Sequence, residues 1–116
     1  MENLSRFDAE QSVIGSILID NDSFDKVLFL SAEDFYSRHH AVIYKKIIEM
    51  MDKGMAVDPV TISEAFNDND LSDVGGIAYL TDLYKNTPTA RNVVSYADIV
   101  KDMSNRRKVV ISMRDA

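Results

Sequence analysis

Apolar side chains recur every three or four residues along most of the chain, which is the spacing of amphipathic helices. The sets with this spacing are, in chain order, Val13, Ile14, Ile17 and Leu18; Phe24, Val27 and Leu28; Ile43, Tyr44, Ile47, Ile48 and Met51; Val60, Ile62, Ala65 and Phe66; Ile77, Leu80 and Tyr84; and Val93, Tyr96, Ala97, Val100 and Met103. The nearest candidate for a strand, residues 57–62, contains Pro59, which a central strand does not tolerate. The sequence therefore predicts an all-α fold.

Turn and cap residues divide the apolar sets from one another. Ser31 and Asp34 resemble a capping box, and the turn that follows is expected to direct Phe35 and Tyr36 into the core. Asp58 before Pro59 predicts a helix start, and the polar run at residues 67–70 (NDND) is expected to end that helix. The resulting prediction is one domain over residues 1–116. It has a packed head of about five to six helices over residues 8–88 and a long final helix over residues 89–116.

The end of the final helix has an apolar set with little chain left to cover it. Residues 104–108 (SNRRK) are wholly polar, and Val109, Val110 and Met113 follow them. An uncovered apolar set on a surface helix indicates a missing partner. We therefore predict self-association, as a weak dimer, through these three residues.

Charge and composition favour protein partners over nucleic acid. The 116 residues carry a formal net charge of −6 with a pI near 4.7, which repels phosphate backbones, so DNA binding is expected to be weak at most. The basic cluster Arg106, Arg107 and Lys108 is interpreted as a solvated helix face. Cysteine is absent, and the first ten residues lack the apolar run of a secretion signal. A cytoplasmic protein without a membrane span is expected.

The sequence bears on two kinds of enzymatic chemistry. No glycine is followed by the Lys-Ser or Lys-Thr of a phosphate-binding loop, so neither ATP nor magnesium is expected to bind this chain. A small metal-dependent hydrolase is the alternative from the enzyme class, using His39 or His40 with Glu33 or Asp34. Adjacent helical positions point about 100° apart, so both histidines cannot easily face one metal. One packed and one solvated histidine is the simpler interpretation.

Tyr79 is the candidate partner-binding residue. Ile77, Leu80 and Tyr84 share one predicted helix face, whereas Tyr79 falls outside it, with Leu83 between. An aromatic residue outside the core face is a frequent interface anchor, because tyrosine offers a large rigid apolar area with a polar tip. Tyr79 and Leu83 are therefore predicted to contact a partner. Burial of Tyr79 against the final helix is the alternative.

Several separated motifs resemble the N-terminal domain of DnaB-type replicative DNA helicases. In order they are residues 9–16 (AEQSVIGS), 33–36 (EDFY), 57–61 (VDPVT), 74–80 (VGGIAYL), 86–90 (NTPTA) and 96–100 (YADIV). Their collinear order over nearly the whole chain makes the resemblance far more specific than any one motif.

The resemblance implies an all-helical head followed by a helical hairpin, of which the final helix is the first arm. In that family the hairpins assemble into a collar on a hexameric ring, and the domain receives the C-terminal domain of primase; a helicase loader is a further candidate partner. ATP and magnesium would belong to a motor domain that these residues do not contain. A stand-alone, phage-type helical adaptor that captures primase or a loader is the alternative function.

Overall fold

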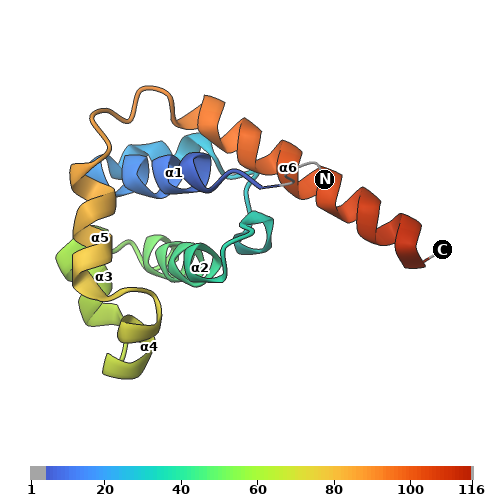
Figure 1. Cartoon of the computed structure of the whole chain (residues 1–116). Coiled ribbons are helices and arrows are strands. Elements are labelled where there is room, and N and C mark those ends of the chain that lie inside the picture. The colour runs from blue at the N-terminus through green and yellow to red at the C-terminus, as the bar shows by residue number, and fades with distance from the viewer. Residues whose placement is uncertain (1–4, 116) are drawn as a thin grey trace.

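The computed structural model describes residues 5–115 and folds this range into helices only, without a strand (Figure 1). The elements are α1 Phe7–Ile19, η1 Asn21–Lys26, η2 Ala32–Asp34, α2 Arg38–Asp52, α3 Pro59–Ala65, α4 Asp68–Asp73, α5 Gly76–Lys85 and α6 Val93–Asp115, where η denotes a short 3-10 helix. The predicted all-α fold with a long final helix is confirmed. None of the described helices combines the length and apolarity needed to cross a membrane.

Helix α1 lies at the centre of the molecule and packs against α2, α5 and α6 (Figure 1). Eight of its 13 residues are buried, so it contacts neighbours on more than one side. Its middle needs Gly15, because a Cβ there would lie 1.9 Å from Thr87 Oγ1 and 2.7 Å from the Leu83 carbonyl oxygen. The missing side chain lets α1 approach the end of α5 closely.

The cap residues begin helices as the sequence predicts, with one addition. The Asp58 carboxylate accepts hydrogen bonds of 2.9 Å from the backbone N–H groups of Val60 and Thr61, and Pro59 occupies the first turn of α3. The polar run 67–70 does follow the end of α3. It also starts the unpredicted helix α4, because the Asn67 side chain accepts from Asp70 N at 2.8 Å.

The turn at η2 separates the two aromatic residues that follow it. Phe35 is 4% exposed and packs on Tyr44 in the core, whereas Tyr36 is 65% exposed. The prediction that Tyr36 points into the core is wrong. Consecutive residues of an extended backbone point to opposite sides, and the backbone at Phe35 is extended.

Helix α5 buries a different face from the predicted one. Leu80 and Leu83 are 0% and 3% exposed, while Ile77 and Tyr84 are 47% and 43% exposed. The predicted core face of Ile77, Leu80 and Tyr84 is therefore wrong. Tyr79 is half-buried and packs against the core, where its hydroxyl contacts Gln11 of α1 and His40 of α2.

Helix α6 has two unlike halves. Its buried residues are Val93, Ala97, Val100 and Ser104, all in the first half. The second half projects away from the other helices toward the C-terminus (Figure 1). There Val109 and Met113 are 59% and 73% exposed, as the sequence predicted, and Val110 is half-buried.

Candidate interaction site

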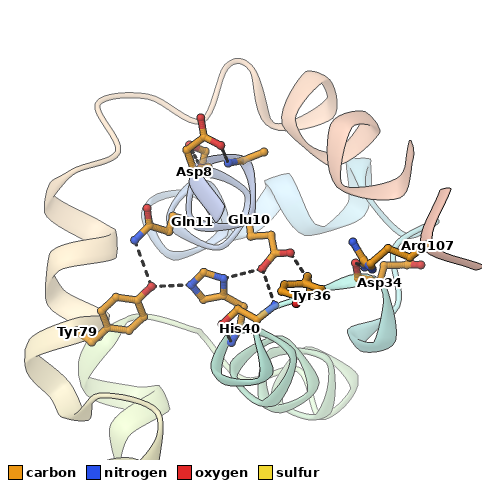
Figure 2. Close-up of polar contacts among 11 residues, drawn as sticks. Asp8, Glu10, Gln11, Asp34, Tyr36, His40, Tyr79 and Arg107 are labelled. Carbon is orange, nitrogen blue, oxygen red and sulfur yellow. Dashed lines mark hydrogen bonds and ion pairs between the residues drawn. The ribbon is translucent and has the colours of Figure 1, made fainter. Parts of the chain in front are cut away.

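A chain of polar side chains links α1, α2 and α5 inside the head. His40 Nδ1 lies 2.8 Å from Glu10 Oε1, and His40 Nε2 lies 2.6 Å from the Tyr79 hydroxyl. The amide of Gln11 donates to the same hydroxyl at 3.2 Å. Figure 2 shows this line of contacts running from Gln11 through Tyr79 and His40 to Glu10.

The Glu10 carboxylate holds the far end of this chain. It accepts from the backbone N–H groups of Tyr36 at 2.7 Å and Ser37 at 3.2 Å, just before α2 begins. Glu10 and His40 are 2% and 0% exposed. A carboxylate that accepts at Nδ1 makes this nitrogen the donor, so in the neutral ring Nε2 accepts from the Tyr79 hydroxyl. Every member of the chain then has a partner, which is what burial requires.

These contacts leave His40 no free nitrogen for a metal. His39 is exposed on the neighbouring face of the helix. Across residues 5–115, no three histidine, aspartate or glutamate side chains are arranged to hold a metal ion. The hydrolase alternative therefore has no supporting arrangement among the described residues.

The outer side of Tyr79 borders a groove of about 160 Å³ between α1 and α5. Asp8, Gln11, Ser12, Tyr79, Asp82, Leu83, Asn86 and Thr87 line it. Burial, and to a smaller extent the charge of Glu10, raises the pKa of the Tyr79 phenol. The phenol therefore keeps its proton at neutral pH and contributes a polar but uncharged surface.

The groove carries negative charge from both of its walls. Asp8 lies on α1 and forms an ion pair with Arg6 at 2.9 Å, a hydrogen-bonded contact that lowers the pKa of the Asp8 carboxyl. Asp82 is exposed on α5. Sequence reasoning missed both aspartates. Asp82 lies three residues after Tyr79, and residues with this spacing share one face of a helix. This spacing is the signal that could have indicated Asp82.

The two predicted partner-binding residues differ in accessibility. Tyr79 borders the groove, but Leu83 is 3% exposed and belongs mainly to the core. This burial gives no support to the prediction that Leu83 contacts a partner. The predicted self-association residues lie elsewhere, on the projecting end of α6, so the structure does not bring the two candidate sites together.

A cluster around Asp34 connects η2 with the middle of α6 and was not predicted. Asp34 is 0% exposed, and its carboxylate contacts Lys101 Nζ at 3.2 Å and Ser104 Oγ at 2.7 Å. Burial acts to raise the pKa of Asp34, but hydrogen bonds from the Ser31 backbone, Ser104 and Lys101 outweigh it, so the pKa lies below its ordinary value. Arg107 donates to the Asp34 carbonyl oxygen at 2.7 Å. The basic cluster, which was predicted to be solvated, is therefore partly bound to Asp34.

Comparison with known proteins gives a consistent result. The model of the DnaB-like helicase N terminal domain family matches residues 2–102. The replicative DNA helicase DnaB of Pasteurella multocida (strain Pm70) is 41% identical over 110 residues, which cover 93% of this chain and 24% of the helicase. The replicative DNA helicase DnaC of Bacillus subtilis (strain 168) is 39% identical over 105 residues, covering 89% and 23%. The chain thus spans about a quarter of the length of these relatives.

Solved structures share the whole architecture. The N-terminal domain of DnaB helicase from Mycobacterium tuberculosis superposes with a TM-score of 0.91 at 32% identity, covering 98% of this chain and 84% of that one. A DnaB-like replicative helicase, whose structure is described with its interactions with primase, gives a TM-score of 0.84 at 27% identity over 92% of this chain and 26% of that one. The family model, the sequence relatives and the fold agree, and the chain belongs to the DnaB-like helicase N terminal domain family.

Proposed function

We propose that this chain is the non-catalytic, partner-binding and assembly part of a replicative DNA helicase, and that it binds the C-terminal domain of the cognate primase. Membership of the helicase family supports the first part. A solved relative described with its interactions with primase supports the choice of partner. The observation that carries the binding role is the groove beside Tyr79 between α1 and α5. A helicase loader is a further candidate partner.

The chemistry of the groove defines the partner surface that would fit. Asp82 supplies negative charge from α5, Asp8 supplies a carboxylate from α1 that Arg6 already pairs, and the Tyr79 ring supplies rigid apolar area. Gln11 and Asn86 add amide groups that can donate or accept hydrogen bonds. Such a groove favours a lysine or arginine side chain, whose apolar stem packs on the ring while its charge faces the carboxylates. The net charge of −6 also attracts a basic partner during encounter.

Reversing the charge of Asp82 is expected to weaken primase binding. Asp82 is exposed and has no role in the core, so Asp82→Lys should fold normally. Loss of a surface ion pair and gain of a repulsion are each worth up to about 1 kcal/mol, which together lower affinity roughly tenfold. Calorimetry with the purified primase C-terminal domain measures the affinity of the variant and of the parent protein.

The matched control is Glu64→Lys, the same charge change at an exposed residue of α3 outside the groove. Its affinity should stay within about twofold of the parent, since a single distant surface charge contributes little. Equal losses in both variants would mean that overall charge, not the groove, determines binding. No binding by the parent protein would contradict primase as the partner.

We further propose that the projecting end of α6 assembles with other copies through Val109, Val110 and Met113. Val109 and Met113 are four residues apart and lie on one face of the helix. Val109→Asp with Met113→Asp is expected to abolish the weak self-association, because it places charge in an apolar contact. Sedimentation at high concentration, with a thermal melt of the head, measures the change.

Ile111→Asp is the control for the face of the helix. Ile111 is 54% exposed, but it lies about 200° around the helix from Val109. Self-association should survive this change. If Ile111→Asp dissociates the assembly and the double variant does not, the contact lies on the other face of α6.

A further inference from the structure

Helix α6 is attached to the head by two different kinds of contact. Up to Val100 its buried residues are apolar and belong to the core cluster. Between Lys101 and Lys108 the helix adds polar contacts with the head, and those of Lys101, Ser104 and Lys108 meet at Asp34. The change in chemistry falls where the helix leaves the head (Figure 1).

The polar contacts span two turns of α6. Lys101 Nζ, Ser104 Oγ and Lys108 Nζ lie 3.2, 2.7 and 3.6 Å from the Asp34 carboxylate. These positions are three and four residues apart, so they share one helix face. Arg107 donates to the Asp34 carbonyl oxygen, and its guanidinium lies 5.3 Å from the centre of the Tyr36 ring. Figure 2 shows Arg107 beside Asp34.

A polar attachment can open without exposing the core. The side chains of Lys101 and Lys108 are already 33% and 53% exposed, so both ammonium groups regain water readily when they separate from Asp34. Opening an apolar contact, such as that of Val93 or Val100, would instead transfer buried apolar area into water. The second half of α6 can therefore separate without exposing the apolar core, although the buried contact between Asp34 and Ser104 is lost.

We propose that Asp34, Lys101, Ser104 and Lys108 form a latch that sets the angle between the head and the arm, residues 105–115 of α6, and whose release lets the arm tilt while both parts stay folded. The latch is independent of the groove and of primase binding. It divides α6 into a fixed root, Val93 to Val100, and an arm whose direction depends on the latch.

Pulsed electron–electron spin resonance distances test the latch directly. The sequence contains no cysteine, so Lys53→Cys at the end of α2 and Ser112→Cys on the arm accept spin labels specifically. Both positions are exposed. The latch is opened by Lys101→Glu with Lys108→Glu, which leaves Asp34 and its capping contacts with Ser31 in place. Arg114→Glu is the control. It also replaces a positive side chain of α6 by a negative one, but at a residue beyond the latch.

The expected result is a shift and broadening of the distance distribution in the double variant. The arm extends about 16 Å past Ser104 at 1.5 Å per residue, so a tilt of about 20° moves its end by about 5 to 6 Å. Circular dichroism should keep the helix content of the parent, whereas the melting temperature should fall, because the buried Asp34 carboxylate loses two opposite charges. The Arg114→Glu control should reproduce the parent distribution.

Two other outcomes would overturn the proposal. An unchanged distribution in the double variant would mean that the arm keeps its direction without the two lysine contacts. A broader distribution together with a loss of helix would mean that the contacts hold the helical structure of the arm, not its angle. If the double variant unfolds, Lys101→Met with Lys108→Met gives the same test, since it removes both charged contacts without placing a carboxylate beside Asp34.

Discussion

Replacement of Glu10 by alanine is expected to lower the free energy of unfolding by about 3 to 5 kcal/mol. The loss leaves His40 Nδ1 and the backbone N–H groups of Tyr36 and Ser37 without their acceptor. Each buried donor left unpaired costs about 1 to 3 kcal/mol. Since single domains of this size are stable by about 5 to 15 kcal/mol, the variant should be close to unfolding at ambient temperature. Urea denaturation followed by circular dichroism measures it.

Two control variants show whether the loss of stability comes from the buried contacts of the Glu10 carboxylate or from the removal of any glutamate. Glu10→Gln keeps the size and one acceptor oxygen, so it should lose less than the alanine variant. Glu64→Ala removes an exposed glutamate and should change stability by about 0.5 kcal/mol or less. A loss for Glu10→Ala as small as that for Glu64→Ala would show that Glu10 does not organise the head.

Replacement of Asp34 by alanine is expected to cost about 2 to 4 kcal/mol. The Ser31 backbone N–H, 2.8 Å from the carboxylate, and the Ser104 hydroxyl lose their acceptor in a buried place. The cost is smaller than for Glu10 because Lys101 can turn to water. The neighbouring Glu33→Ala, at an exposed position of the same 3-10 helix, should be nearly neutral. Equal effects of the two variants would contradict the buried role of Asp34.

The pH dependence of stability gives a second measurement on Asp34. Its pKa in the folded state is lowered, so its contribution is fully present above its unfolded pKa of about 3.9 and is lost as the pH falls through the folded pKa. The parent protein should therefore lose more stability between neutral pH and pH 3 than Asp34→Asn does. Parallel slopes for the two proteins would mean that the carboxylate has the same pKa folded and unfolded.

The two buried carboxylates have different positions in the domain. Glu10 ties α1 to the start of α2 and, through His40, to Tyr79 on α5. Asp34 ties η2 to α6. A defect at Glu10 should therefore disturb the head and its groove, whereas a defect on the α6 side of Asp34 should chiefly disturb the arm.

The sequence determined the fold class, the long final helix and the start of α3, whereas the final helix begins at Val93 and not at residue 89. Repeated three-to-four spacing is a local property of the backbone geometry, so it predicts helices without knowledge of their neighbours. Asp58 and Pro59 start α3 for equally local reasons. Val109 and Met113, which are exposed, belong to an apolar set that follows a wholly polar run of the same helix, a pattern that is visible in the sequence.

The burial of individual residues depended on tertiary structure. Helix α5 has a wide apolar side that includes Ile77, Tyr79, Leu80, Leu83 and Tyr84, and the sequence alone did not show which part of it is buried. In the structure Leu80 and Leu83 face the core, where the backbone of Leu83 lies against Gly15 of α1, and Ile77 and Tyr84 stay exposed.

The roles of Glu10 and Asp34 could be decided only by the assembled helices. In the sequence Glu10 resembles a solvated acid among 19 aspartates and glutamates, and Asp34 is recognisable only as a cap residue beside Ser31. Their partners lie far along the chain: His40 is 30 residues from Glu10, and Ser104 is 70 residues from Asp34. A charge is buried only where packing supplies donors that replace water. No local pattern contains that information, because the donors come together only when α1 meets α2 and η2 meets α6.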